Sequence, residues 1–271
     1  MNDIPDRPAL LRAMVSLAEA GGDIVWCHFT AGCAVMHKAD ESPVTAADRD
    51  AEAAILAGLA VAAPDIPVVA EEEAAAGRLP AVDGAFFLVD PLDGTKEFVR
   101  RGDDFTVNIA LVEHGVPTMG VVYAPARDTL YAGDVTGGAW MAHRAPNGER
   151  GAERPIAVRT CAAHPCAVAS KSHAMPGLDE WLAAGGVANR VSVGSSLKFA
   201  LVASGEADVY PRTGPTMEWD TAAGDAVLRA AGGRTLDVDG QPFRYGKPGF
   251  RNAGFVATGG YDPAPLRPFL P

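Results

Sequence analysis

The sequence predicts an α/β protein built from two lobes, a helix-and-antiparallel-sheet lobe followed by a layered α/β lobe. Two N-terminal segments have helical apolar spacing, short apolar runs separated by turns follow them, and the second half alternates strand-like and helix-like segments. The 271 residues and 48% hydrophobic content suffice for a substantial core. The polar, turn-rich segment 145–151 is the expected lobe boundary, which divides the chain into 1–145 and 146–271.

Two helices are expected at the N-terminus. Asp6 stands where an N-cap would, before a segment that keeps helical apolar spacing as far as Phe29. A second helix is expected from Thr45 to a stop before Pro64. Asp48, three residues after Thr45, completes a pattern like a capping box.

The period then changes to that of strands. In the first lobe the expected strands are residues 67–70, 85–89, 106–112, 116–123, 128–132 and 138–142. In the second lobe the expected strands 167–169, 191–194 and 207–210 alternate with the expected helices 178–184, 196–203 and 220–231. This alternation is typical of a layered α/β structure.

Charge and composition narrow the class of function. The net charge of −11 at pH 7 argues against general binding to nucleic acid or to anionic membranes. No apolar run is long enough to cross a bilayer, and the first residues lack the basic start and apolar core of a secretory signal. We therefore expect a cytoplasmic protein. Four cysteines do not make a disulfide scaffold, and Cys27, His28, Cys33 and His37 match no common zinc spacing.

The string D-P-L-D-G-T places Asp90 and Asp93 within four residues, where an apolar strand ends. Carboxylates this close repel unless a proton or a cation separates them. Hard divalent cations favour such oxygen clusters, and the backbone carbonyl of Leu92 is a plausible extra ligand. Gly94 and Thr95 add little bulk, so amide groups could approach a phosphate at the start of a helical turn. Alone, the same string also fits a turn whose aspartates bond their own backbone.

Two further acidic segments are candidates for the same cluster. Glu71 follows the expected strand 67–70 and could lie beside Asp90 at one edge of a sheet, although an acidic run is also typical of a solvated loop. Asp220 opens the last expected helix, where an aspartate often serves only as an N-cap. A helix N-terminus aimed at metal and phosphate would use the same dipole functionally.

Together these strings resemble the metal-dependent, lithium-sensitive inositol monophosphatase superfamily, through D-P-L-D-G-T, the pair Glu71-Glu72 and the pair Trp219-Asp220. The strings D-P-L-D-G-T-K-E-F, F-T-V-N-I-A-L and G-S-S-L-K-F are closer to the CysQ-type 3'(2'),5'-bisphosphate nucleotidases. The resemblance covers about residues 10–255. It implies the layered α-β-α-β-α sandwich of the sugar phosphatases. It also implies Mg²⁺-dependent removal of the 3'-phosphate from adenosine 3',5'-bisphosphate (PAP), and from its phosphosulfate analogue (PAPS), by a metal-activated water.

The resemblance also implies a set of site residues. Two or three Mg²⁺ ions would be bound by Glu71, Asp90, Asp93, Asp220 and the Leu92 carbonyl. The attacking water would be held and activated by Asp48 and Thr95. The scissile phosphate would contact Gly94 and Thr95, and the nucleotide with its second phosphate would contact Ser170, His173, Ser195, Lys198 and Arg212. Trp219 is expected in the core. Members of the family are often dimers, which leaves a homodimer open.

Three departures from the family pattern concern Ala70, Lys171 and the short segment after Glu73, of which only the last could reshape the mouth of the site. Two other functions stay open. One is another phosphatase of the superfamily, acting on inositol phosphate, fructose bisphosphate or histidinol phosphate. The other is a non-catalytic nucleotide-binding protein. By themselves His173 and Lys198 would fit a structural histidine and a surface lysine.

Overall fold

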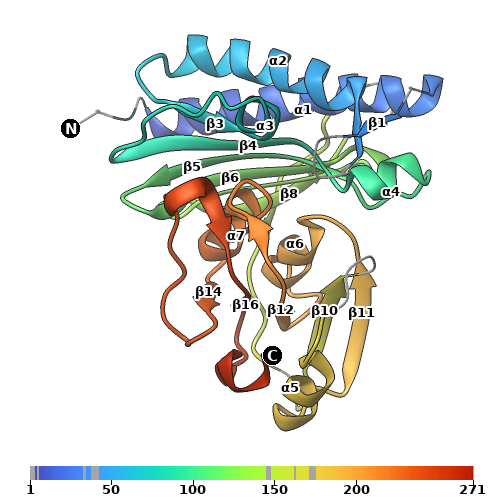
Figure 1. Ribbon diagram of the computed structural model, residues 1–271, viewed down its shortest axis with the longest axis vertical. Coiled ribbons are helices and arrows are strands. Elements are labelled where there is room, and N and C mark those ends of the chain that lie inside the picture. The colour runs from blue at the N-terminus through green and yellow to red at the C-terminus, as the bar shows by residue number, and fades with distance from the viewer. Residues whose placement is uncertain are drawn as a thin grey trace.

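The computed structural model describes residues 4, 6–32, 35–37, 43–144, 148–161, 163–170 and 175–270, without the side chains of 35–37 and 43–44. The described part forms five layers: two long helices, a seven-stranded sheet, a pair of helices, a five-stranded sheet and a short outer helix (Figure 1). This order confirms the predicted α-β-α-β-α sandwich.

The first layer contains helices α1 (Arg7–Ala31) and α2 (Ala46–Ala62). The predicted capping box of α2 is present, since Thr45 caps the helix and its N–H donates to Asp48 at 2.7 Å. At α1, Asp6 occupies the predicted N-cap position, although its side chain makes no capping hydrogen bond. Both helices bury an apolar face against the first sheet.

The first sheet consists of β3 (Val68–Ala70), β4 (Ala85–Asp93), β5 (Thr106–Glu113), β6 (Val116–Ala124), β7 (Thr129–Asp134), β8 (Gly138–His143) and β9 (Arg154–Ile156), in this order. β3 runs parallel to β4, and every other neighbouring pair is antiparallel. The sequence did not predict β9, which continues this sheet beyond residue 145. The division of the chain into lobes at that residue stays a prediction.

The second sheet has the order β11-β10-β12-β16-β14. Its strands are β10 (Cys166–Ser170), β11 (Asn189–Val193), β12 (Val209–Arg212), β14 (Arg234–Asp237) and β16 (Phe255–Thr258). The helices of this half are α5 (Leu178–Ala184), α6 (Leu197–Ala203) and α7 (Ala222–Ala230). The expected strands and helices of the second lobe are therefore present, and the sequence did not predict β14 and β16.

Several short elements complete the described part of the chain. They are β1 (Val35–His37) paired with β2 (Pro43–Thr45), β13 (Thr216–Met217) paired with β15 (Arg251–Asn252), α3 (Glu71–Ala75), α4 (Thr95–Val99), and the 3₁₀ turns η1 (Pro125–Arg127), η2 (Pro248–Phe250) and η3 (Arg267–Phe269). Their brevity leaves no periodic signal in the sequence.

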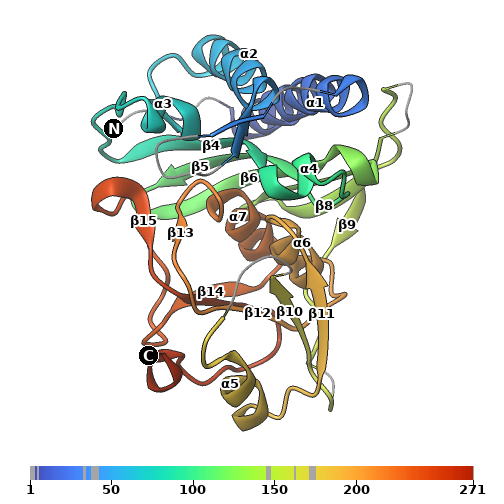
Figure 2. The same cartoon turned by 45° about the vertical axis from the view of Figure 1, so that its right-hand side comes forward.

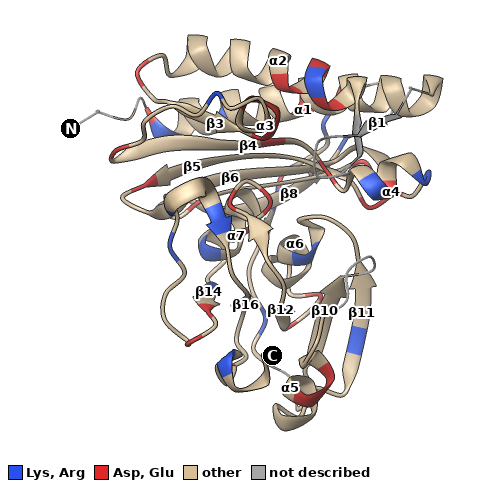
Figure 3. Ribbon diagram, viewed as in Figure 1, with Lys and Arg blue, Asp and Glu red and all other residues tan. Residues whose placement is uncertain are grey.

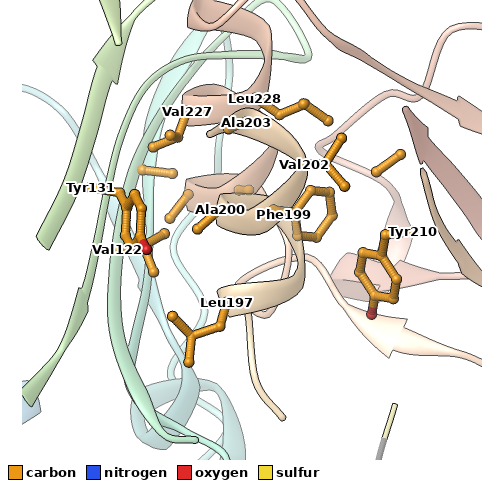
Figure 4. Packing of buried hydrophobic residues seen from close by; sticks show 14 of the residues in the cluster. Val122, Tyr131, Leu197, Phe199, Ala200, Val202, Ala203, Tyr210, Val227 and Leu228 are labelled. Atoms are coloured by element: carbon orange, nitrogen blue, oxygen red, sulfur yellow. The ribbon is translucent and has the colours of Figure 1, made fainter. Parts of the chain in front are cut away.

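Helices α6 and α7 lie between the two sheets and form the inner core (Figure 2). Figure 4 shows that Leu197 and Ala200 point to the side of the first sheet, whereas Phe199 points to Tyr210 on the second. The rings of Phe199 and Tyr210 pack edge to face, with their centroids 5.2 Å apart. A continuous apolar core therefore links the two sheets and fixes the elements that carry the site.

A close approach between β6 and α7 depends on Gly120. A Cβ at this position would stand 2.3 Å from the carbonyl oxygen of Ala223 and 2.8 Å from the Cβ of Ala226. The absence of a side chain lets α7 lie directly on the sheet, three residues after Asp220. The position of Asp220 thus depends on a residue 100 positions earlier in the chain.

We predict that Gly120→Ala lowers the free energy of unfolding by about 1–3 kcal/mol, because backbone atoms of α7 must move to make room. Urea denaturation measures the change. Gly137→Ala is the matched control, since the nearest atom to its added Cβ is 3.8 Å away. Equal stability of the two variants would contradict the role given to the close approach.

Candidate functional site

A pocket of about 660 Å³ lies where the first sheet meets the second half of the chain. The predicted residues that line it are Glu71, Asp90, Leu92, Asp93, Gly94, Thr95, Ser170, Ser195, Lys198, Arg212 and Asp220. Asp48 lies just behind it, bonded to Thr95. His173 lies outside the described residues. In Figure 3, acidic segments on α3 and β4 and a basic segment on α6 belong to elements that meet at this pocket.

Parallel pairing of β3 with β4 brings Glu71 and Asp90 to the same sheet edge. Ala70 is paired with Val89, so the next residues along the two strands are Glu71 and Asp90. The prediction that Glu71 and Asp90 lie beside one another is confirmed. The segment from Glu71 is not a loop but the first turn of α3.

The chain path around Asp90 differs from the prediction. β4 does not end before Asp90 but continues to Asp93, with a shift in its pairing to β5 between the two aspartates. Asp90 also accepts a hydrogen bond from the Leu92 N–H at 3.0 Å. Asp90 and Asp93 are three residues apart, so in a regular strand their side chains would lie on opposite faces of the sheet. The irregular pairing at Pro91 lets both side chains line the pocket.

Asp220 reaches the pocket from the second half of the chain, but not as the first residue of the helix. α7 begins at Ala222, and Asp220 lies in the preceding turn. Its Oδ2 accepts a hydrogen bond from the Met217 N–H at 2.8 Å. The carboxylate is therefore held by the β13–β15 ribbon, and the N-cap alternative is wrong.

The carboxylates influence one another strongly. Burial raises the pKa of Asp90 well above its usual range, and the charges of Glu71, Asp93 and Asp220 add to the effect. Burial, then Asp93 and Glu71, raise the pKa of Asp220 in the same way. The pKa of Asp93 rises to about 6, again through burial, although Lys198 and the Ser196 N–H oppose the shift.

Such a set of oxygens fits a hard divalent cation, which would replace protons as the neutralising charge. Among the described residues, no three acidic, histidine or cysteine side chains already form a closed ligand set. The carboxylates of the pocket therefore do not by themselves identify the metal ligands.

Asp48 and Thr95 form a polar pair beside this cluster. Asp48 is 2% exposed, and its Oδ2 accepts hydrogen bonds of 2.7 Å from both the N–H and the hydroxyl of Thr45. The Thr95 hydroxyl lies 3.4 Å from the other oxygen, Oδ1, and 3.2 Å from the Leu92 carbonyl oxygen. Burial raises the pKa of Asp48 to about 6. The capping box thus fixes one oxygen of Asp48 and leaves the other directed at Thr95.

Two buried cations, Lys198 and Arg212, also line the pocket; they come from the second half of the chain, and we call them the basic wall. Lys198 is 4% exposed, so it is not a surface lysine, and its Nζ donates to the backbone carbonyl of Ser195. Burial lowers the pKa of Lys198 to about 8. Arg212 is also buried and donates to the carbonyls of Gly214 and Pro215, at 3.4 and 3.3 Å. Both cations are held by backbone groups and contribute to the pocket lining.

Sequence reasoning missed several residues of the site. Lys96, Glu97, Thr216, Met217 and Arg251 also line the pocket. Glu52 lies behind it. Its carboxylate accepts hydrogen bonds from the backbone N–H groups of Glu72 and Glu73, at 2.8 and 3.0 Å, and so holds the start of α3. Burial raises the pKa of Glu52 to about 7. No sequence signal marks Glu52 or Arg251, because their roles depend on contacts between distant segments.

Trp219 and Leu79 lie at the margins of the pocket. Trp219 is 8% exposed and belongs to the inner core, as predicted, although it also contributes to the pocket wall. Leu79, in the short segment after Glu73, is 47% exposed and lies at the pocket mouth.

The described ranges contain no helix of the length and apolarity that a membrane span requires.

Comparison with known proteins matches this arrangement to a family. The model of the inositol monophosphatase family matches residues 6–260. The chain belongs to the inositol monophosphatase family. Members of this family are metal-dependent phosphatases that generally use Mg²⁺.

Named relatives point to one branch of the inositol monophosphatase family. The chain is 46% identical over 249 residues to the 3'(2'),5'-bisphosphate nucleotidase CysQ of Shigella flexneri, covering 91% of this chain and 98% of that one. It is 45% identical to CysQ of Escherichia coli K12, again covering 91% of this chain and 98% of that one. The crystal structure of CysQ from Bacteroides thetaiotaomicron superposes with a TM-score of 0.79 at 36% identity, covering 93% and 97% of the two chains. An inositol monophosphatase of Thermotoga maritima superposes with a TM-score of 0.72 at 25% identity, covering 91% of each.

The raised pKa values predict a pH-dependent stability. On folding, the pKa of Asp48 rises from 3.8 to about 6, that of Asp93 from 3.8 to about 6 and that of Glu52 from 4.5 to about 7. Groups whose pKa is raised contribute stability that is complete below the unfolded values and is lost as pH rises through the folded values. We expect the metal-free protein to lose several kcal/mol of unfolding free energy between about pH 4 and pH 7, at about 1.4 kcal/mol per pKa unit.

Chemical denaturation after dialysis against chelator measures this loss. Mg²⁺ should restore more stability at pH 8 than at pH 5, because it neutralises charges that protons no longer neutralise. Glu52→Gln serves as a comparison, since it should flatten the pH dependence without removing the Mg²⁺ response. A stability that rises from pH 5 to 8 without metal would contradict the assignment.

Proposed function

We propose that this chain is a Mg²⁺-dependent 3'(2'),5'-bisphosphate nucleotidase. It removes the 3'-phosphate of adenosine 3',5'-bisphosphate to give AMP and phosphate, and it accepts the phosphosulfate analogue. The observation that carries the proposal is one pocket with acidic groups on one wall and two buried cations, Lys198 and Arg212, on the other. A substrate with two phosphates suits such a pocket, because one phosphate needs metal and the other needs fixed positive charge.

The metal-binding groups would be the side chains of Glu71, Asp90, Asp93 and Asp220 and the Leu92 carbonyl, holding two or three Mg²⁺ ions. The raised pKa values of three of these carboxylates support the assignment, since they show how poorly the pocket tolerates uncompensated negative charge. Bound Mg²⁺ supplies charge neutralisation on the phosphoryl oxygens and lowers the pKa of a water molecule.

The attacking water would be positioned by Thr95 and Asp48. The Thr95 hydroxyl can accept a hydrogen bond from the water while it donates to Asp48 Oδ1, which lies 3.4 Å away. Asp48, with a pKa of about 6, can take up the proton that the water gives up. The water oxygen would form a bond to phosphorus as the bond between phosphorus and the 3'-oxygen breaks. The water's proton would pass to the Thr95 hydroxyl as Thr95 gives its own proton to Asp48, and the released 3'-oxygen would take a proton from a solvent water molecule, while Asp48 later returns its proton to solvent.

The scissile phosphate would contact Gly94 and Thr95, at the turn between β4 and α4. Gly94 has φ of +90°, a backbone conformation that favours glycine, and an added Cβ would stand 2.8 Å from the Asp104 carbonyl oxygen. The turn is therefore tightly packed from behind, which supports a fixed position for its amide groups.

The rest of the nucleotide would lie along the basic wall. Ser170, Ser195, Lys198 and Arg212 would contact the nucleotide and its second phosphate, and His173, which lies outside the described residues, is proposed for the same role on sequence alone. A phosphate beside Lys198 would favour its charged form and so oppose the lowering of its pKa by burial. The homodimer and the cytoplasmic location stay predictions.

We predict that a phosphate-release panel with and without Mg²⁺ gives its highest kcat/KM with adenosine 3',5'-bisphosphate. Competing substrates in the panel are inositol 1-phosphate, fructose 1,6-bisphosphate and histidinol phosphate. A preference for one of these would replace the proposed substrate with another within the same family. Tight nucleotide binding without phosphate release from any substrate would instead indicate a binding protein.

Asp93→Asn tests the role of the acidic wall. We expect kcat to fall at least about a hundredfold, as for the loss of a group that supports a metal site, while the Tm stays the same or rises. The Tm should not fall because the substitution removes one of several repelling charges. Asp262→Asn, at a side chain that is 94% exposed, is the control and should leave both quantities unchanged. Full activity of Asp93→Asn would refute the metal assignment.

A further inference from the structure

Three buried polar side chains meet at the base of the pocket, between β5 and the start of α6, and one of them, Ser196, also contributes to the pocket lining. Thr106 is 0% exposed, Asn108 1% and Ser196 2%. The Ser196 hydroxyl donates to Asn108 Oδ1 at 2.7 Å and lies 2.9 Å from the Thr106 hydroxyl oxygen. Because Ser196 has a single hydroxyl hydrogen and uses it toward Asn108, Thr106 is the donor to Ser196. We call these three residues the Ser196 network.

The Ser196 network lies between the two walls of the pocket. On β5, Asn108 is paired with Asp90 of the neighbouring strand, and Thr106 is paired with Asp93. Directly opposite residues of an antiparallel pair have neighbouring side chains on one face of the sheet. The two β5 members thus stand next to the two aspartates of the acidic wall.

Ser196 connects the same point to the basic wall. It is the N-cap residue of α6, and it lines the pocket together with Ser195 and Lys198. Its backbone N–H is bonded to the carboxylate of Asp93. The network therefore runs from the β5 neighbours of Asp90 and Asp93 to the turn that holds Lys198.

A second contact supports the same junction two residues before Ser196. The Gly194 N–H donates to Asp104 Oδ2 at 2.9 Å, and a Cβ on Gly194 would stand 2.7 Å from the Cβ of Asp104. Asp104 is 1% exposed and also accepts a hydrogen bond from Arg127. The segment 194–196 is thus held against the start of β5 by backbone, side-chain and packing contacts.

The Asn108 amide nitrogen has no hydrogen-bond partner among the described residues, although it is buried. An apolar residue would avoid that unfavourable free energy if packing alone were required. The amide of Asn108 supplies the oxygen that accepts the Ser196 hydroxyl hydrogen bond. The geometry therefore favours a role of Asn108 in orienting Ser196 over a role in stabilising the fold.

We infer that Thr106, Asn108 and Ser196 are positioning residues that set the separation between the acidic and the basic walls. The inference rests on the proposed function, because only a substrate with two anionic ends must fit both walls at once. Such a fit requires a tolerance of roughly 0.5 Å, and an error of about 1 Å can lower a rate on the order of a hundredfold. Each wall alone stays intact when the network is broken.

Ser196→Ala removes the central hydroxyl and provides the main test. We expect kcat for adenosine 3',5'-bisphosphate to fall at least about tenfold, and kcat for p-nitrophenyl phosphate, which reaches only the acidic wall, to fall less than about threefold. Two properties should stay close to wild type: the affinity for AMP without metal, measured by calorimetry, and the rise in Tm on adding Mg²⁺. Equal losses for both substrates, or a loss of AMP affinity, would overturn the inference.

Two variants of Thr106 separate the hydroxyl from the packing of its methyl group. Thr106→Val keeps the shape and removes the hydroxyl, and it should reproduce the substrate-dependent loss. Thr106→Ser keeps the hydroxyl and should stay near wild type. The reverse order would show that packing matters and would overturn the inference.

Thr258→Val is the matched remote control. Thr258 is also fully buried, and its hydroxyl donates to the Tyr261 carbonyl at 2.6 Å, outside the pocket lining. It should lower the Tm without changing the ratio of the two kcat values, and a changed ratio would contradict the inference. The proposed function is judged from wild type alone: if wild type releases no phosphate from the bisphosphate, that function fails and the inference falls with it.

Discussion

Mutual repulsion among carboxylates is the constraint on which the rest of this structure depends. Glu71, Asp90, Asp93 and Asp220 come from three separate segments and share one pocket, where burial and neighbouring charge raise the pKa of the last three. A fold that gathers such groups loses stability; Lys198 offsets part of that loss at Asp93, and a bound cation or proton offsets more of it. The unfavourable arrangement persists because the apolar layers around it hold the segments in place.

The layers do this through a few specific contacts. The parallel β3–β4 pair brings Glu71 beside Asp90, and the inner helices bring Asp220 from the far side. Asp220 is held by the Met217 N–H, and Met217 is paired with Arg251 in the β13–β15 ribbon. Groups that repel one another are thus anchored by contacts outside the cluster, as a preorganised site requires.

Local features of the sequence predicted much of this arrangement. The spacing of Thr45 and Asp48 predicts a capping box, because the interaction spans three residues. The positions of Glu71 and Asp90 after two strands predict a shared sheet edge, and the structure confirms it. Roles of individual side chains came from the family resemblance, and their assignment to metal and nucleotide stays a prediction.

What the sequence could not predict depends on contacts between distant segments. The hydrogen bond that orients Asp220 requires the two-residue strands β13 and β15, which are too short to leave a periodic pattern. The support of α3 by Glu52 joins residues about twenty positions apart, and an isolated glutamate on a helix is typical of a solvated face. Likewise, β4 continues through Pro91, where local rules predict a turn, because pairing to β5 resumes at Asp93.

The basic wall completes the electrostatic argument. In a chain of net charge −11, an anionic ligand would be repelled at long range, so its binding must rely on cations at short range. Lys198 and Arg212 suit this purpose because backbone carbonyls hold them, which leaves their positive charge uncompensated by those contacts. Burial lowers the pKa of Lys198 to about 8, so the lysine is still mostly charged at neutral pH but loses its proton more readily than an exposed lysine. A bound phosphate would favour the charged lysine, just as a bound cation would favour the ionised carboxylates. Each set of like charges is costly to bury, although Lys198 and Asp93 attract one another, and a substrate carrying two phosphates and accompanied by Mg²⁺ supplies opposite charge to both sets.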